Sequence, residues 1–498
     1  MRPGLLWRDG DLDLTRLPAA WPSLVADLGL ERLYEAMARD DPFILEVARR
    51  VVPAGLEKPD EVRHRQAVLR DAIASSVAIR ELYAIAGNAV ETERSTWGAG
   101  LRSPELAMRR SVGVLAGLLD NLRALRSIVE GDWPAWTSNG LTAFAATVRA
   151  AVDDRFLATA GELLASLDAR TVVATVRLGE GNRGVDYVLR RTPDGGRRLR
   201  DRIAAQARTG LVVDVTLRDQ NALNALAELR AQALASTGAA VGDATAQVLG
   251  FFRSLRTELA FVVGCLNLHE TLTGGGVATC FPVVAPGVGR AFEARDLSDP
   301  GLALGTTAAI VGNDVSADGC GLVVVTGANG GGKSTLLRAV GVAQVMLQAG
   351  MFVAARELRA GPRSNVLTHF TREEEAGLDA GRLEAELRRL SALIDDARPT
   401  SLVLLNESLS STNERDGSVI AAEVVTALAD AGATVWYVTH LHELARSIEA
   451  MERADTVFLR AERGAGGERS FRVVEAPPLE TSFGRDVYER VVRRPGEV

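Results

Sequence analysis

The chain has 498 residues, of which 47% are hydrophobic and 24% charged, and its formal net charge is −7. The length predicts two or three domains with large cores, and the negative charge excludes a global attraction to nucleic acid, so any such contact needs a local basic patch. The first residues hold no apolar run typical of a secretory signal, and no long uncharged apolar stretch predicts a membrane span. Three cysteines without metal-like spacing favour a reducing, cytoplasmic compartment.

The first half of the chain reads mainly as helices. Residues 59–90 open with a proline and acidic residues, and apolar residues follow at spacings of three and four, which predicts an amphipathic helix. Similar patterns cover roughly residues 103–130, 140–168, 217–236 and 243–272. A domain of mutually packed helices explains these patterns, and so do helical arms or levers.

One segment interrupts the helical patterns. In "TVVATVRLGEGNRGVDYVLRRT" (171–192), β-branched and polar residues alternate on both sides of a glycine-containing turn, which predicts a β-hairpin. Arginines cluster after it, among them Arg190, Arg191, Arg197 and Arg198. They form either a phosphate-binding patch or a solvated face paired with nearby aspartates, and the general behaviour of charge runs favours the solvated face.

A glycine- and proline-rich stretch, "TGGGVATCFPVVAPGVG" (273–289), has the composition of a domain boundary. After it, short apolar strands alternate with helices, which predicts an α/β domain with a mostly parallel sheet. We therefore expect an α + α/β protein in three parts: a helical segment over 1–58, a helical core or lever domain over 59–275 and an α/β domain over 276–498.

The segment "GLVVVTGANGGGKSTLLRAVGVAQVMLQAG" (321–350) carries the strongest chemical signal. A buried strand runs into Gly327–Ser334, which matches G-x-x-x-x-G-K-[ST], and an apolar-periodic helix follows. This strand–loop–helix context predicts a P-loop that binds ATP, in which backbone N–H groups and the helix N-terminus hold phosphate oxygens. The expected nucleotide contacts are Gly327, Ala328, Asn329, Gly330, Gly331, Gly332, Lys333, Ser334 and Thr335.

Two residues of this loop have specific expected roles. Lys333 should bridge the β- and γ-phosphates, and the hydroxyl of Ser334 should ligate Mg²⁺. The chain has only two lysines against 55 arginines, so a lysine here fits the need for a compact point charge.

A second strand, "SLVLLNES" (401–408), ends in Asn406 and Glu407. Glu407 is the expected group that orients or deprotonates the attacking water. A P-loop ATPase normally has aspartate at position 406. Asn406 can still accept a hydrogen bond near Mg²⁺ but brings no negative charge, so we expect weakened metal binding and a working site.

Two further segments fit the same site. The strand in "TVWYVTHLHEL" (434–444) ends near His440, which either caps a helix or senses the γ-phosphate. The stretch 373–394 passes two glycines and enters a helix, and such a helix start is suited to meet a phosphate, including one held by a second subunit.

Together these motifs resemble the MutS family of mismatch-repair ATPases. The matching segments, in chain order, are "AIVGNDV" (309–315), "TGANGGGKST" (326–335), "LQAGMFVAARELRAGPRSNVLTHF" (347–370), "NESLSSTNERDG" (406–417), "VTHLHEL" (438–444) and "SFGRDV" (482–487). The helical segments 59–73 and 251–268 are similar to the family's lever helices. The resemblance implies a P-loop NTPase domain of the ABC type, an adenine pocket that includes Ile310, and a homodimer whose Gly381 and Arg382 reach the neighbouring subunit's ATP.

The sequence also departs from the family pattern. There is too little chain before residue 59 for a mismatch-recognition domain, and the hairpin is too short for a full DNA clamp. In the best match to the trans signature, Gly381-Arg382-Leu383, leucine stands where the family has serine, and a register on Gly377 is the alternative. The expected function is therefore a homodimeric, Mg²⁺-dependent ATPase that binds double-stranded or branched DNA without reading mismatches. The alternatives are a nucleotide-gated dimeric scaffold with negligible hydrolysis, or another ABC-type P-loop ATPase. No LSGGQ-like segment supports the latter.

Overall fold

The structure is a computed structural model of the whole chain. It describes residues 2–7, 17, 20–95, 104–131, 136–167, 173–178, 184–190, 220–286, 289–371, 381–463 and 469–478. The chain forms two compact units. Unit 1 comprises Met1–Gly4, Val77–Ala135 and Thr142–Leu259, and unit 2 comprises Leu5–Ser76, Trp136–Leu141 and Ala260–Val498.

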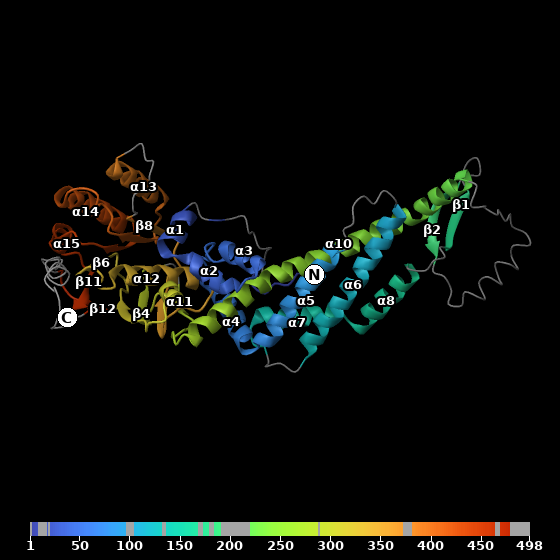
Figure 1. The fold of residues 1–498 in the computed structure, drawn as a ribbon, viewed down its shortest axis with the longest axis horizontal. Coiled ribbons are helices and arrows are strands. Elements are labelled where there is room, and N and C mark those ends of the chain that lie inside the picture. Colours follow the sequence, from blue (N-terminus) through green and yellow to red (C-terminus); the bar gives the residue numbers. More distant parts are fainter. Residues whose placement is uncertain are drawn as a thin grey trace, which may run out of the picture. The chain divides into compact units, whose positions relative to one another are not determined.

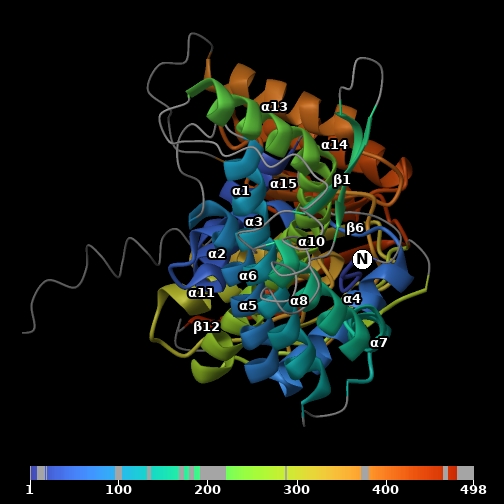
Figure 2. The same ribbon diagram turned by 90° about the vertical axis from the view of Figure 1, so that its right-hand side faces the viewer.

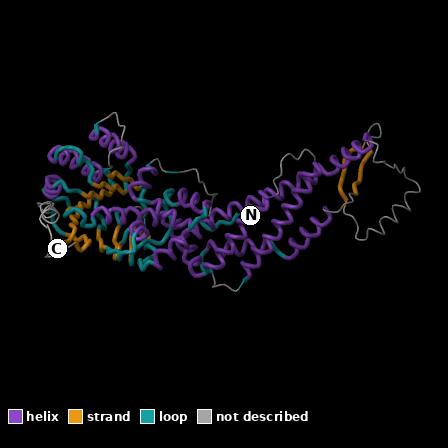
Figure 3. The backbone as a smooth tube through the Cα atoms, in the orientation of Figure 1, coloured by secondary structure: helices purple, strands orange, loops and turns teal. Residues whose placement is uncertain are grey.

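Unit 1 is mainly helical, as Figure 3 shows. It is built from α5 (Ser76–Ser95), α6 (Pro104–Glu130), α7 (Asn139–Ala151), α8 (Asp154–Leu167), the hairpin of β1 (Val173–Leu178) and β2 (Gly184–Arg190), and α10 (Gln220–Gly274) as far as Leu259. Buried Val112, Leu119, Leu164 and Val241 pack together, so the apolar faces of α6, α8 and α10 share one core. The two strands pair antiparallel, which confirms the predicted hairpin.

Unit 2 holds the remaining helices and both larger sheets. Its N-terminal helices are α1 (Trp21–Leu28), α2 (Leu30–Ala38), α3 (Pro42–Val51) and α4 (Pro59–Ala74). The Asp41 carboxylate caps α3 by accepting from the N–H groups of Phe43 and Ile44, which are otherwise unpaired at a helix start. α1 packs against a strand of the larger sheet and against the helix after the glycine-rich loop, so this N-terminal segment covers part of the α/β core.

The larger sheet of unit 2 has six strands in the order β12-β11-β6-β10-β9-β8. The strands are β6 (Leu322–Thr326), β8 (Val366–Phe370), β9 (Leu402–Asn406), β10 (Thr434–Val438), β11 (Thr456–Arg463) and β12 (Arg469–Glu475). All neighbours are parallel except β11 and β12. Because parallel strands end at the same edge, the residues after β6, β9 and β10 meet there.

Helices cover both faces of this sheet, which explains why β6 and β10 are buried throughout. On one face lie α13 (Arg382–Asp396), α14 (Glu414–Asp430) and α15 (His442–Glu449), whose apolar residues share a core with Leu322, Val403 and Tyr437. On the other face α12 (Lys333–Gln348) packs against β8, β9 and β10 and also against a strand of the smaller sheet (Figure 1). The start of α12 is thereby fixed at the edge where the strands end.

The smaller sheet of unit 2 has the order β3-β7-β4-β5. Its strands are β3 (Val283–Val284), β4 (Phe292–Leu297), β5 (Asn313–Ser316) and β7 (Glu357–Ala360), and the short helix α11 (Pro300–Gly305) follows β4. α11 also contacts α12. The segment between α11 and β5 is therefore held beside the start of α12.

The predicted order of a helical region followed by a sheet-containing region is confirmed, but individual helices differ from the sequence patterns. The pattern over 59–90 is divided at Ser75 between α4 and α5, where the Ser75 hydroxyl donates to the Asp71 carbonyl. The patterns 217–236 and 243–272 belong to one continuous α10. The predicted boundaries at 58/59 and 275/276 stay a prediction; the two compact units group the chain differently. Within the described residues, no helix is long and apolar enough to cross a membrane.

Candidate active site

The glycine-rich loop 327–332 connects β6 to α12, as the sequence predicts. Gly327 has φ 113° and Gly332 has φ 95°, which are left-handed values that side chains rarely adopt. A Cβ at Gly332 would also lie 3.1 Å from the carbonyl oxygen of Phe471. Glycine is therefore required for both the turn and the close approach of β12 to the loop.

Lys333 is the first residue of α12 and its side chain is only 4% exposed. Its ammonium donates to the carbonyl oxygens of Gly327 at 2.8 Å and Ala328 at 3.1 Å. Burial lowers the pKa of this ammonium, and the nearby Glu407 carboxylate opposes the shift. The cation is therefore held inside the curve of the loop, where an anionic ligand would gain most from it.

Ser334 and Asn406 meet at the same edge of the sheet. The Ser334 hydroxyl donates to Oδ1 of Asn406 at 2.9 Å. Because Asn406 ends β9 and Ser334 lies in the first turn of α12, strand and helix bring together two oxygen atoms that are 72 residues apart in the chain. Both oxygens are of the hard type that Mg²⁺ prefers.

Glu407 directly follows β9 in a left-handed conformation, with φ 54°. Its backbone N–H donates to the Val438 carbonyl at 2.8 Å, so the residue stays tied to β10. Nδ1 of His440 lies 4.0 Å from Oε2 of Glu407, and both side chains are partly exposed, at 38% and 34%. A carboxylate beside a histidine, open to solvent, can orient a water molecule and accept its proton.

A cavity of about 590 Å³ opens at this edge, which is within the size range of small-ligand sites. It is lined by Leu302, Thr306, Ala308, Ala309, Ile310, Val311, Asn313, Asn329, Gly330, Gly332, Lys333, Ser334, Thr335, Glu407 and Phe471. The structure thus brings Ile310, Glu407 and most of the predicted loop residues to one cavity. Gly327, Ala328 and Gly331 belong to the loop without lining the cavity.

Phe471 and Asn313 line this cavity but were missed as site residues in the sequence. Phe471 is 47% exposed and has φ 57°. Asn313 donates from Nδ2 to the Phe471 carbonyl at 3.3 Å, and its Oδ1 accepts from the Val473 N–H at 2.7 Å. These two bonds hold β12 and the phenyl ring at the cavity. No local pattern reveals them, since the partners are 158 and 160 residues apart.

The other predicted site residues lie elsewhere or outside the described residues. Gly381 is the N-cap of α13 and is not among the residues that line the cavity, and the side chain of Arg382 lies outside the described part of the structure. The backbone of Arg190 ends β2, but its side chain lies outside the described part of the structure, as do Arg191, Arg197 and Arg198 in full. The segment 482–487 also falls outside the described residues.

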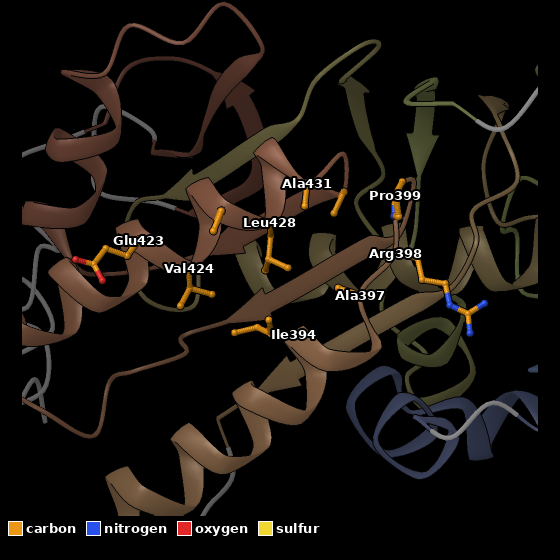
Figure 4. A pocket seen from close by; sticks show the side chains of 10 residues that line it. Ile394, Ala397, Arg398, Pro399, Glu423, Val424, Leu428 and Ala431 are labelled. Atoms are coloured by element: carbon orange, nitrogen blue, oxygen red, sulfur yellow. The ribbon is translucent and has the colours of Figure 1, made fainter.

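A second pocket, of about 370 Å³, lies between α13 and α14, which are neighbours in both ribbon views (Figure 1 and Figure 2). Figure 4 shows apolar side chains of the two helices, among them Ile394, Val424 and Leu428, with Glu423 and Arg398 at its ends. Its residues come from the C-terminal parts of these helices. It lacks a phosphate-binding loop, so the chemistry is assigned to the cavity at the glycine-rich loop.

Comparison with known proteins places both halves of the chain in one family. The family model described as MutS2 N-terminal domain matches residues 57–274, and the one described as MutS domain V matches residues 323–498.

Individual relatives give the same result. Over 186 residues the chain is 35% identical to a DNA mismatch repair protein MutS 2 of Halobacterium salinarum. This alignment covers 36% of the present chain and 21% of that protein. It is 33% identical over 196 residues to a mitochondrial DNA mismatch repair protein mutS homolog of Sarcophyton glaucum (38% and 20%), and 32% identical over 185 residues to an Endonuclease MutS2 of Anaeromyxobacter sp. (37% and 22%). The alignments span about a fifth of the length of these relatives. The motifs around the cavity and both domain matches agree, and the chain belongs to the MutS family.

Proposed function

We propose that this protein is an ATPase that binds Mg²⁺–ATP in the 590 Å³ cavity. The observation that carries the proposal is the convergence of Lys333, Ser334 and Glu407 on one cavity wall. A buried cation, a hydroxyl and a carboxylate are the groups that phosphoryl transfer to water uses for charge neutralisation, metal binding and water activation.

The phosphates lie along loop 327–332 and the N-terminus of α12. Backbone N–H groups there donate to phosphate oxygens, and the helix dipole favours their negative charge. Lys333 exchanges its bonds to loop carbonyls for bonds to phosphate. The base occupies the part of the cavity between Ile310 and Phe471, both of which offer apolar surface.

Glu407 acts on water at the γ-phosphate. Its carboxylate orients the attacking water and accepts its proton as the bond to the leaving phosphate breaks. His440 lies 4.0 Å from that carboxylate. Its imidazole contacts either the γ-phosphate or the carboxyl group of Glu407 after that group has taken up the proton.

The donor set fits a magnesium ion. Ser334 and Asn406 offer neutral oxygens 2.9 Å apart, and among the described residues no cluster of three or more His, Cys, Asp or Glu offers a richer metal site. Bound Mg²⁺ would neutralise phosphate charge. Asn406 supplies an oxygen without a charge, so the metal is held more weakly than it would be by aspartate.

Steady-state ATP hydrolysis by wild type, Lys333→Ala and Glu407→Gln tests the proposal. We expect Glu407→Gln to lower kcat by roughly 10²- to 10⁴-fold and to keep nucleotide affinity, whereas Lys333→Ala weakens nucleotide binding itself. Glu423→Gln, at the apolar pocket on α14, is the matched control and should behave as wild type. A wild-type rate no higher than that of Lys333→Ala would refute the proposal.

A second candidate function is a nucleotide-gated scaffold that hydrolyses ATP negligibly. The contact of Ser334 with an amide oxygen in place of a carboxylate favours it. Turnover in wild type that disappears in Glu407→Gln excludes this scaffold.

We further propose that the protein is a homodimer acting on double-stranded or branched DNA. Its support is the family, together with relatives that are named as DNA mismatch repair proteins. Replacing Arg190, Arg191, Arg197 and Arg198 by glutamine should weaken binding to duplex and branched oligonucleotides. The slope of log K against log salt should flatten by about 0.9 for each phosphate that the variant protein no longer neutralises. An unchanged slope would show that these arginines do not contact DNA phosphates. If the wild-type protein bound no DNA at low salt, DNA would be excluded as its partner.

A further inference from the structure

Glu386 on α13 is a buried carboxylate outside the cavity. Its side chain is 4% exposed, and both oxygens accept hydrogen bonds from the segment after β9. The Leu409 N–H donates to Oε1 at 2.7 Å, and the Ser411 hydroxyl donates to Oε2. Burying a carboxylate is costly unless it is well hydrogen-bonded, and hydrogen bonds to an ionised acceptor are among the stronger ones. Glu386 therefore fixes the segment 408–411 to α13.

That segment directly continues from Glu407 and holds an unusual backbone. Glu407 has φ 54° and Leu409 has φ 64°, and neither is glycine. Two such residues so close together persist only where surrounding contacts over-determine the conformation.

The surrounding contacts come from several elements. The Thr371 hydroxyl donates to the Glu407 carbonyl at 2.7 Å, and the Tyr437 hydroxyl donates to the Ser408 carbonyl. The connection from α13 to this segment runs through Glu386.

We infer that Glu386 is a positioning residue that couples α13 to the catalytic carboxylate of Glu407. This inference rests on the proposed function. α13 begins at Gly381, which we propose to meet the partner subunit's nucleotide, and Glu386 lies about 7 Å further along the helix axis. A shift of α13 on nucleotide binding by the partner reaches Glu407 through Leu409 and Ser411. The geometry of hydrolysis in one subunit thereby depends on the helix that contacts the other.

The test measures kcat for ATP and the affinity for a fluorescent ATP analogue in separate assays. Glu386→Ala should lower kcat by about 10- to 100-fold, because small displacements of a reacting group are costly. The analogue's Kd should stay within about threefold of wild type, since no cavity-lining residue is touched. Glu386→Gln keeps an acceptor for the Leu409 N–H and should restore most of the rate.

Two more variants control for folding and location. Glu384→Ala removes a glutamate of the same helix that is exposed and pairs with Arg388, so its rate should match wild type. Ser411→Ala removes one of the two bonds without touching α13, and should lower kcat less than Glu386→Ala while leaving the unfolding midpoint nearly unchanged.

The outcomes separate the inference from the proposed function. Active wild type with unaffected Glu386→Ala and Ser411→Ala overturns the inference alone. A second outcome also overturns the inference. If Glu386→Ala and Glu386→Gln lose kcat, analogue affinity and thermal stability equally while Ser411→Ala is unaffected, the role of Glu386 is structural. A wild type that binds the analogue yet hydrolyses no ATP refutes the ATPase, and the inference falls with it.

Discussion

Asn406 is the residue at which this chain departs most from a standard ATP-hydrolysing site. Its Oδ1 accepts the Ser334 hydroxyl at 2.9 Å, so an aspartate would fit the same position and add a negative charge beside the metal. We predict that Asn406→Asp lowers the Mg²⁺ concentration for half-maximal ATP hydrolysis by about three- to tenfold, with a smaller change in kcat. The measurement is a Mg²⁺ titration at fixed ATP. An inert wild type revived by this substitution would show that asparagine had disabled the site.

Much of the cavity wall could be predicted from sequence because its residues lie in contiguous motifs. Lys333 and Ser334 belong to one glycine-rich motif, and Glu407 follows a strand whose apolar run is visible in the sequence. Asn313, Glu386 and Phe471 could not be predicted. Their significance depends on contacts between distant segments, and each reads locally as an ordinary polar or apolar residue.

At the scale of elements, β12 pairs with β11 and is tied to the cavity by Asn313. Asn313→Ala removes two bonds from a buried side chain and leaves the Phe471 carbonyl and the Val473 N–H without these partners. We predict a loss of about 1–3 kcal/mol in unfolding free energy and weaker binding of an ATP analogue, measured by urea unfolding and fluorescence titration. Phe471→Ala should weaken analogue binding with a smaller loss of stability, because its ring is partly exposed. Analogue binding by Phe471→Ala equal to that of wild type would remove Phe471 from the base site.

The contact between β8 and the end of β9 makes stability depend on pH. Burial, together with the charge of Arg389, lowers the pKa of His369 to about 4 from 6.5, against an opposing effect of Glu386. The Ser408 hydroxyl donates to the His369 carbonyl at 3.0 Å, so its oxygen accepts from Nδ1 at 2.7 Å. Burial and the charge of Arg389, rather than this hydrogen bond, disfavour the protonated imidazole.

The sign of the effect follows from proton uptake. Between pH 6.5 and about 4 the unfolded chain binds a proton at His369 that the folded chain does not, so stability is full above this window and falls as pH drops through it. We predict that wild type loses on the order of 2 kcal/mol more than His369→Gln between pH 7 and pH 5, measured by urea unfolding. Equal losses of unfolding free energy in wild type and His369→Gln would contradict the assignment of this pH dependence to His369.

Helix periodicity located the helices but not their ends. The apolar pattern continues across Ser75, but the backbone leaves helical geometry there, with φ −127° and ψ 41°, so the pattern alone does not reveal the break. Conversely, the patterns over 217–236 and 243–272 join in α10, because the isolated Gly238 and Gly242 between them are tolerated inside a helix, whereas a proline is not.

At the scale of the whole molecule, the sequence could not reveal which segments form a unit. α1–α4 precede unit 1 in the chain, yet they belong to unit 2 with the sheets, and α1 packs on β8 and α12. Their amphipathic patterns require an apolar partner without identifying it. That partner comes from segments about 300 residues later.

The proposed homodimer makes a prediction for mixtures of variants. Gly381 has φ −58°, and a Cβ built there meets nothing within 4 Å, so Gly381→Asp should fold and place a negative charge against the partner's phosphates. Lys333→Ala disables a subunit's own site but keeps its Gly381. Each variant alone should be inactive. In a mixed dimer, the Gly381→Asp subunit keeps Lys333 and receives Gly381 from the Lys333→Ala subunit, so one site of two is complete.

We therefore predict that an equimolar mixture, after subunit exchange, recovers about a quarter of wild-type ATPase activity, because half of randomly formed two-fold dimers are mixed and each has one complete site. The matched control mixes Lys333→Ala with the double variant Lys333→Ala/Gly381→Asp and should stay inactive, since no subunit then has an intact loop. Recovery in the first mixture alone requires that the start of α13 acts on the neighbouring subunit. An inactive mixture of subunits would mean that each subunit completes its own site, and activity of Gly381→Asp by itself would mean that residue 381 meets no nucleotide.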